Sequence, residues 1–392
     1  MGSQNKEFKN LKEQTEILAN KGLVINDPDY AMEILLRENY FFLSGYRHVF
    51  INEGTNRFIE GTTFEELYSL FRFDRKFRNI IFKNLLIIEN NVKSILSYKL
   101  SLKYGYREKE YLNPKNFTNN PAKKRQVNDL IKKMKRQIKA NATQHSATMH
   151  YVQNYGYIPL WVLVKVLSFG IVGELYSILK NDDQISISEE YGLDQATFSN
   201  YIIMLSNYRN LCAHEDIVFE NKTQRAIEDT KYHKLLNIPV EANEYQSGKT
   251  DIFALIIIVK QLLKSDEFLN MANEIRDAFS ELHDELHSIK LDKVLSRMGF
   301  PSNWYDLTTI DNKMKVDKED YDIEQDDLET QQEMKKSFTS DEVRREEVRF
   351  HKEAKRERRE IEREYRQQER QENEIDELLN RDNKPDNRKG FF

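Results

Sequence analysis

The segment Tyr208-Arg209-Asn210-Leu211-Cys212-Ala213-His214 brings a guanidinium, an amide and an imidazole together within a short stretch of chain. The apolar spacing of residues 198–205 predicts an amphipathic helix that continues into this segment. Since successive helical residues turn by about 100°, Asn210 and His214 share a face, and Arg209 lies about 140° around the axis from His214. An imidazole with a pKa of about 6.5 can take a proton from a ribose 2′-hydroxyl, and a guanidinium can stabilise charge on phosphate oxygens. The candidate catalytic residues for RNA cleavage are therefore Arg209, Asn210 and His214.

The small residues Cys212 and Ala213 predict that another helix packs closely against this segment. A two-fold axis at such a contact would bring the Arg and His of two chains into one cleft, so we expect the active form to be a homodimer. The alternative interpretation is that an R-x4-H string arises by chance, and that its Arg and His are surface residues with favourable contacts to the helix dipole. We expect Cys212 to be a packing residue and not a nucleophile.

A second segment, from Lys103 to Lys139, holds twelve basic and three acidic residues. Clustered cations along a helix are typical of an RNA-binding surface. The residues predicted to contact RNA are Lys123, Lys124, Arg125, Lys132, Lys133, Lys135, Arg136 and Lys139. Aromatic residues that could stack on bases lie just upstream, and these are Tyr104, Tyr106, Tyr111 and Phe117. The alternative is that these cations are only the solvated face of a helix whose core stripe is Leu130, Ile131, Met134 and Ile138.

Other catalytic schemes lack their residues in this sequence. It contains no glycine-rich phosphate loop, no H-E-x-x-H and no G-x-S-x-G. His283 and His287 have the spacing of a helical metal chelate, but only Asp284 and Glu285 accompany them. We therefore expect neither a metal nor a cofactor. The single cysteine excludes a disulfide framework.

The elements that must position these residues are predicted to be helices. One wide apolar stripe consists of Phe77, Ile80, Ile81, Leu85, Ile88, Val92, Ile95 and Leu96. Two further stripes are Trp161, Val164, Leu167 and Ile171, and Ile252, Leu255, Ile258, Val259, Leu262 and Leu263. We predict an all-α domain over residues 1–300, in which residues 41–64 are the hardest to assign. Helix breaks are predicted near Pro28, Gly54, Gly105–Pro121, Pro159, Asp182 and Pro239.

Charge separates the C-terminal residues from the rest of the chain. The net charge of the whole chain is −5. Residues 311–392, with 20 basic and 26 acidic residues, have a net charge of −6, so residues 1–310 have a net charge of +1. We predict an acidic linker over residues 301–339 and a charged helical tail, partly disordered, over residues 340–392, with opposite charges at helical spacing such as Glu346 and Arg349. No apolar run reaches the roughly 18 residues of a membrane span, and the N-terminus lacks a secretory signal. We therefore expect a soluble, cytoplasmic protein with no membrane partner.

The segment around Arg209 and His214 resembles the R-N-x-x-A-H signature of the Abi-like (AbiD/AbiF) phage abortive-infection proteins, within the HEPN superfamily of α-helical ribonucleases. Further blocks are similar to those of the family and follow its order, from about Leu23 to Phe219. They are Asn39–Tyr46 (N-Y-x-x-L-S-G-Y) with Phe50, Phe58 with Gly61–Phe64, Phe73-Asp74 with Arg78, Ile88-Glu89, Pro159–Val162 and Leu167–Gly170. The residues expected to form the fold, not to act in catalysis, are Tyr40, Gly45, Trp161 and Gly170.

The resemblance implies a HEPN-type helical bundle that cleaves RNA without a metal, at a composite site where two R-x4-H motifs face each other across a dimer. It implies that Arg209 and His214 are the catalytic pair and that Asn210 orients or supports them. The chain differs from many relatives at Lys165, where they carry an acidic residue, and at Ile217, where they carry a basic one.

The expected function is that of a bacterial anti-phage effector, a toxin-like endoribonuclease. Attack of the 2′-hydroxyl would leave a 2′,3′-cyclic phosphate, and a bound RNA would restrain the enzyme. One alternative is a non-catalytic RNA-binding protein that forms a stable ribonucleoprotein. Another is an effector regulated by protein, in which the charged tail recruits a partner.

Overall fold

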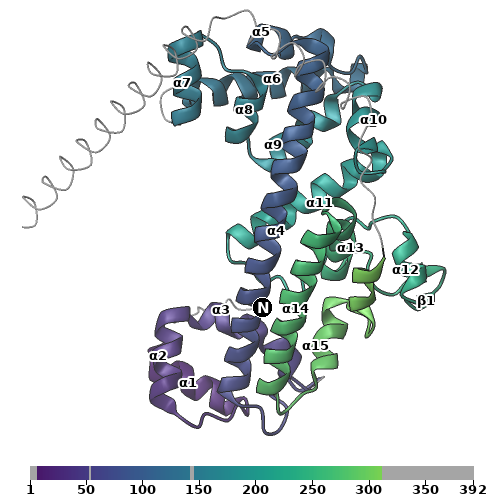
Figure 1. The fold of residues 1–392 in the computed structure, drawn as a ribbon. Helices are drawn as coiled ribbons and strands as arrows, with labels where there is room; N and C mark the ends of the chain where they lie inside the picture. The colour runs from purple at the N-terminus through teal and green to yellow at the C-terminus, as the bar shows by residue number, and fades with distance from the viewer. Residues whose placement is uncertain (1–6, 53, 142–144, 311–392) are drawn as a thin grey trace, which may run out of the picture. The chain divides into compact units, whose positions relative to one another are not determined.

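The computed structural model describes residues 7–52, 54–141 and 145–310, which are mostly helical, as predicted (Figure 1). The α-helices are α1 (Leu11–Asn20), α2 (Pro28–Glu38), α3 (Tyr40–Ser44), α4 (Phe64–Tyr104), α5 (Glu108–Tyr111), α6 (Lys124–Asn141), α7 (Ser146–Tyr155), α8 (Leu160–Val166), α9 (Phe169–Ile178), α10 (Asn181–Glu189), α11 (Gln195–Ala213), α12 (Lys231–Leu235), α13 (Ile252–Leu262), α14 (Ser265–Glu285) and α15 (Leu291–Met298). The 3-10 helices are η1 (Gly45–Phe50), η2 (Pro114–Asn116), η3 (Pro121–Lys123) and η4 (Trp304–Thr309). Strands β1 (Val240–Glu241) and β2 (Glu244–Tyr245) pair antiparallel, with Val240 opposite Tyr245.

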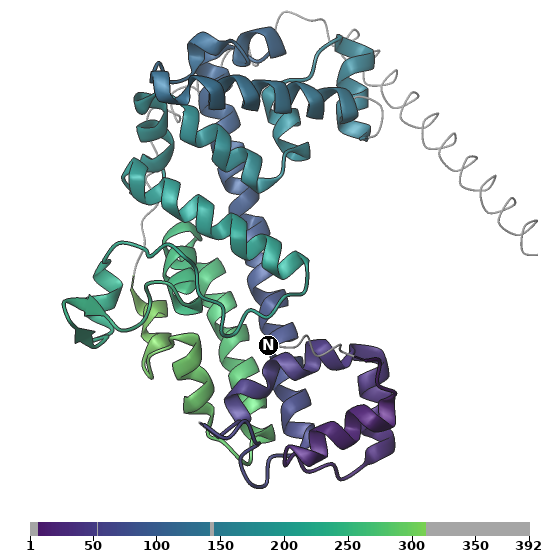
Figure 2. The same ribbon diagram turned by 180° about the vertical axis from the view of Figure 1, so that it is seen from behind.

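Helix α4 is the element against which much of the fold packs (Figures 1 and 2). It has 41 residues, and at about 1.5 Å per residue it is roughly 60 Å long. A capping box begins it, because Thr63 accepts from the backbone of Glu66 and the Glu66 carboxylate accepts from the backbone of Thr63. Gly105, with a positive φ of 87°, ends it. The stripe predicted from the sequence is its buried face, against which α8, α11 and α14 pack.

Helices α4 and α14 lie antiparallel in a regular register. Ion pairs join Arg72 to Glu285 at 2.6 Å, Lys76 to Glu281 at 2.7 Å and Lys83 to Glu274 at 2.6 Å. These half-exposed pairs each contribute only about 0–1 kcal/mol. Beneath them the aromatic rings of the two helices meet, with Phe73 and Phe279 5.4 Å apart. Burial of these rings therefore contributes most of the contact's stability, and the ion pairs fix its register.

Helix α13 differs from its prediction. The spacing predicts an apolar stripe on one side, but Phe253, Ala254, Ile256 and Ile257 are as fully buried as the stripe itself. A helix that is apolar on every side is enclosed by the rest of the protein. The predicted stripe from Trp161 to Ile171 also differs, since it is divided between α8 and α9.

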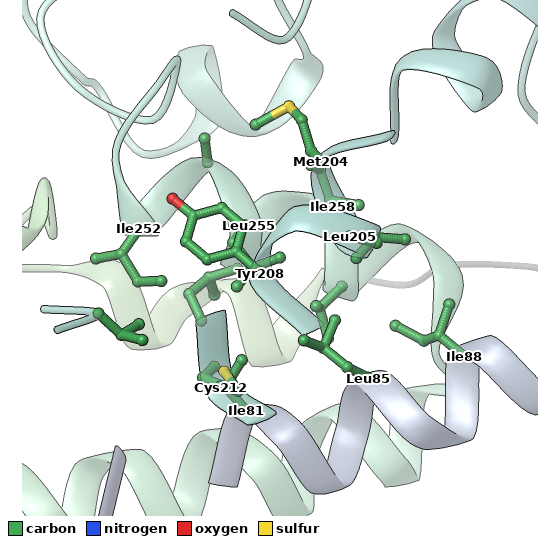
Figure 3. Close-up of a cluster of buried hydrophobic side chains, with 14 of the residues drawn as sticks. Ile81, Leu85, Ile88, Met204, Leu205, Tyr208, Cys212, Ile252, Leu255 and Ile258 are labelled. Atoms are coloured by element: carbon green, nitrogen blue, oxygen red, sulfur yellow. The ribbon is translucent and has the colours of Figure 1, made fainter. Parts of the chain in front are cut away.

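Helices α9 and α11 approach each other through glycines. A Cβ on Gly173 would lie 2.9 Å from Ile202, and one on Gly170 would lie 3.4 Å from Ser206. The other face of α11 packs into the core, where Tyr208 and Cys212 lie among Ile81, Leu85, Ile252 and Leu255 (Figure 3). Contacts on both sides of α11 therefore fix its orientation. They also fix the direction in which its C-terminal end points.

The predicted boundary at residue 300 lies about ten residues too early. Residues 301–310 belong to the folded unit, because the Trp304 ring lies 5.3 Å from that of Phe300 and Leu307 is fully buried. The rest of the predicted linker and the predicted tail, residues 311–392, lie outside the described residues. Within the described part of the chain, no helix combines the length and apolar character needed to cross a membrane.

Candidate functional site

The predicted motif lies at the C-terminal end of α11. The helix ends at Ala213, and His214 is its C-cap, with a backbone N–H that donates to the carbonyl of Asn210 at 3.0 Å. Glu215 follows in the left-handed conformation, with φ of 58°, and turns the chain away from the helix axis. Asn210, Ala213 and His214 are exposed. The helix prediction is therefore confirmed, and two of the three candidate side chains are open to solvent.

Arg209 lies against α4. Its Nε is 3.3 Å from Oε2 of Glu89, and its guanidinium lies 5.8 Å from the centre of the Phe82 ring. Glu89 is buried and also pairs with Lys93 at 2.7 Å. One carboxylate thus faces two cations, so the cluster of Glu89, Lys93 and Arg209 keeps a net positive charge. The Arg209 side chain is 31% exposed, which leaves part of the guanidinium accessible.

His214 lines a pocket of about 1070 Å³ that Arg209 does not line. Most of its other lining residues lie between Leu36 and His48, a stretch that includes α3, and the exposed Phe41 and Phe42 are among them. Arg47 also lines this pocket, has no carboxylate partner among the described residues, and donates one long hydrogen bond of 3.4 Å to the carbonyl of Ser44. Within a single chain, His214 therefore lines the pocket, whereas Arg209 contacts Glu89 and Phe82 of α4.

A buried carboxylate holds the segment that follows His214. Asp74 accepts hydrogen bonds from the Tyr46 hydroxyl at 2.7 Å, from Arg78 at 3.0 Å, and from the backbone N–H groups of Val218 and Phe219 at 3.2 and 2.8 Å. Burial raises the pKa of the Asp74 carboxyl, and these four donors oppose that shift. This network joins α4, η1 and the segment after α11, and so it fixes the wall of the pocket beside His214.

Gly45 allows these elements to meet. A Cβ at this position would lie 2.5 Å from Cδ1 of Ile217, so a larger residue would require the end of the Ile217 side chain to turn aside. The close approach of Ile217 to Gly45 is therefore a specific contact that agrees with the expectation that Gly45 forms the fold. Ile217 fills this space with an apolar side chain.

Cys212 does not lie at an accessible helix contact. It is buried in the chain's own core, and burial raises the pKa of its thiol to about 12, so it stays protonated at neutral pH. The suggestion that Cys212 and Ala213 together admit a second chain is wrong for Cys212. Ala213 remains exposed.

The basic segment forms α6, as predicted, and its apolar stripe packs into the core. Three of the predicted RNA contacts are already engaged: Lys123 donates to the carbonyl of Ser177 at 2.8 Å, Arg125 lies 3.6 Å from Asp129, and Lys133 lies 2.9 Å from Glu174. The other cations are exposed and unpaired among the described residues, and they are Lys124, Lys132, Lys135, Arg136 and Lys139. None of the α6 cations lines the His214 pocket.

The aromatic residues upstream of α6 mostly serve the fold. Tyr111 and Phe117 are buried, and Tyr104 donates to Asp183 at 2.6 Å. Only Tyr106 of the four is exposed. Trp161, one of the residues expected to form the fold, is half exposed and lies 5.8 Å from the Tyr106 ring.

In the described part of the chain, no three His, Cys, Asp or Glu side chains gather closely enough to hold a metal ion. The helical chelate considered for His283 and His287 is not formed, because α14 ends at Glu285. His283 instead lies 3.4 Å from Asp284.

A family model described as Abi-like protein matches residues 33–220. The matched region contains η1, α4 and the whole of α11, and thus both Asp74 and the R-x4-H motif. No curated protein and no solved structure matches the chain significantly.

Proposed function

Since the chain belongs to the Abi-like family, we propose that it is an anti-phage abortive-infection effector that cleaves RNA with its R-x4-H motif. The observation that carries this proposal is the position of His214. Its imidazole is exposed at the wall of a pocket of about 1070 Å³, on a backbone that the Asp74 network fixes. An imidazole that is open to solvent can accept a proton from a bound hydroxyl and so serve as a general base.

The reaction needs only groups that the chain supplies. His214 accepts the proton of a ribose 2′-hydroxyl, and the oxygen attacks the adjacent phosphorus. The bond from phosphorus to the 5′-oxygen breaks, which leaves a 2′,3′-cyclic phosphate and a 5′-hydroxyl that takes up a proton. Arg209 stabilises the charge on the phosphate oxygens. No step needs a metal.

A second copy of the chain completes the site in this proposal. In one chain Arg209 contacts Glu89 and does not line the pocket of His214, so the proposal brings Arg209 of a second chain to that pocket. Asn210 and Ala213, which are exposed near the end of α11, are where the second α11 would pack. The two-fold symmetry of a homodimer then gives two equivalent sites. We further propose that a bound RNA restrains the enzyme through the unpaired cations of α6.

The test is cleavage of RNA by the purified protein. We expect products with 2′,3′-cyclic phosphate ends, formed equally well in EDTA, and loss of cleavage in His214→Ala and Arg209→Ala. The matched control is His283→Ala, which removes an exposed histidine from α14. Cleavage that survives His214→Ala, or that requires Mg²⁺ and leaves 5′-phosphates, refutes the proposal.

The alternative is an RNA-binding protein without catalysis, and one contact favours it. The Glu89 carboxylate occupies Arg209, which is the arrangement expected of a structural arginine. This alternative predicts that the wild-type protein binds RNA without cutting it. Cleavage by the wild-type protein therefore distinguishes the two cases, and if it is found, a changed rate in Glu89→Gln shows that Arg209 acts on phosphate.

A further inference from the structure

A cluster of aromatic side chains lies at the surface formed by α7, α8 and the residues that begin α5. We call Tyr106, Tyr151, Tyr155, Tyr157, Trp161 and His150 the aromatic cluster. Neighbouring rings are in contact: Tyr106 lies 5.7 Å from Tyr157 and 5.8 Å from Trp161, Tyr155 lies 6.3 Å from Tyr157 and 5.3 Å from Tyr151, and His150 lies 6.0 Å from Tyr155. Tyr106, Trp161 and Tyr155 are 39%, 43% and 57% exposed. The rings thus form a continuous surface that is not covered by the described residues.

The fold holds this surface in place. Gly156, with a positive φ of 73°, ends α7 and allows the chain to turn sharply before Tyr157. The backbone N–H of Ile158 donates to the Glu108 carboxylate, and the Tyr111 hydroxyl donates to the Ile158 carbonyl at 2.8 Å. These two hydrogen bonds fix the loop that carries Tyr157 to α5, and the Tyr157 ring therefore packs against the Tyr106 ring.

The charges around the cluster are mainly positive. The Arg107 guanidinium lies 5.9 Å from the centre of the Tyr106 ring and 5.3 Å from that of Tyr157. Lys109 and Lys165 are exposed nearby in α5 and α8. The two acidic residues of α5 bind backbone N–H groups: Glu108 accepts from Ile158 and Glu110 from Arg107. Helix α7 also packs on α6, which carries the unpaired cations.

We propose that the aromatic cluster binds unpaired bases of single-stranded RNA, while neighbouring cations contact its phosphates. Exposed aromatic rings combined with an arginine stack on bases, and a basic surface follows the backbone. Duplex RNA keeps its bases stacked inside the helix, so it cannot use these rings. The site lies outside the His214 pocket, and it rests on the proposed function only in taking RNA as the ligand.

The two tryptophans of the chain allow a direct test. Trp161 belongs to the cluster, and Trp304 is buried. In a His214→Ala chain, which is not expected to cut RNA, Trp304→Phe leaves Trp161 as the reporter and Trp161→Phe leaves Trp304. The probes are a mixed-sequence 12-nucleotide RNA and the same RNA annealed to its complement. We expect the single strand to quench Trp161 and leave Trp304 unchanged, and the duplex to quench neither.

Affinity measured by fluorescence anisotropy gives the second arm. Tyr106→Ala and Tyr155→Ala should each weaken single-strand binding by about 5- to 150-fold. The control is Tyr30→Ala, because Tyr30 in α2 is 38% exposed and also contacts another tyrosine, Tyr68.

Each other outcome overturns the proposal. These are no binding of the single strand, binding without quenching of Trp161, equal quenching by duplex, and a loss of self-association instead of RNA affinity in Tyr155→Ala. Binding is measured without cleavage, so the two proposals can fail separately. If the single strand quenches Trp161 but the wild-type protein cuts no RNA, only the proposed function is refuted. Cleavage without quenching refutes the aromatic cluster alone.

Discussion

The hydrogen bond from Tyr46 to Asp74 can be removed without changing the packing of either residue. Tyr46→Phe deletes one hydroxyl that lies 2.7 Å from the buried carboxylate and keeps the ring, which stacks on Phe219 at 5.6 Å. A hydrogen bond to a charged group contributes about 1.5–3 kcal/mol. We therefore expect Tyr46→Phe to lower the free energy of unfolding by about 1.5–3 kcal/mol, measured from urea unfolding at pH 7.

The same network predicts a larger effect at its centre. Asp74→Asn leaves Arg78, which is only 3% exposed, without its carboxylate, and breaking a buried ion pair costs about 3–5 kcal/mol. In the double variant, Tyr46→Phe should cost little more, so the double-mutant cycle should give a coupling energy comparable to the single hydroxyl effect. Tyr30→Phe, at an exposed ring, is the control and should change stability by less than about 0.5 kcal/mol. Additive effects in the cycle, or a loss below about 0.5 kcal/mol for Tyr46→Phe, would show that Asp74 does not hold Tyr46 of η1.

Three further predictions concern other parts of the molecule. Gly45→Ala should lower the melting temperature only slightly and change cleavage little, because its Cβ meets the end of the Ile217 side chain at 2.5 Å and that side chain can turn aside; a large loss of either would show that Ile217 is held rigidly. Lys135→Gln with Lys139→Gln should lower the slope of log affinity for single-stranded RNA against log salt by about 1.4, at about 0.7 per lost phosphate contact, and an unchanged slope would place the phosphates elsewhere. Burial lowers the pKa of His233, so the unfolded chain takes up a proton first as the pH falls below about 6.5. Stability should therefore decrease from pH 7.5 to 5.5, and urea unfolding of His233→Gln should show a smaller decrease.

The sequence by itself determined the helices, because their signals are local. The stripe of α4, its Thr63 and Glu66 capping box and the end at Gly105 all lie within a few residues of the structure that they specify. The same is true of α6, where apolar residues at steps of three and four fix the buried face and leave the cations outside. The residue types at the motif also sufficed to choose His214 and Arg209 as candidates.

Errors arose where burial depends on distant parts of the chain. The sequence does not show that α13 is enclosed on every side, that Trp161 stays half exposed, or that residues 301–310 pack on α14, where the Trp304 ring lies 5.8 Å from that of Phe279. Each of these depends on which surface another element happens to cover. An apolar side chain has the same local pattern whether a partner covers it or not.

The arrangement of the site was decided by the tertiary structure alone. Arg209 and its partner Glu89 are 120 residues apart, and Asp74 and Phe219 are 145 apart. Helical periodicity places neighbours only within a turn or two, so it cannot relate groups at such separations. The sequence therefore supplied the chemistry of the imidazole and the guanidinium. The packing of α11 on α4 and of η1 on the segment after the motif decided that His214 opens into a pocket while Arg209 rests on a buried carboxylate.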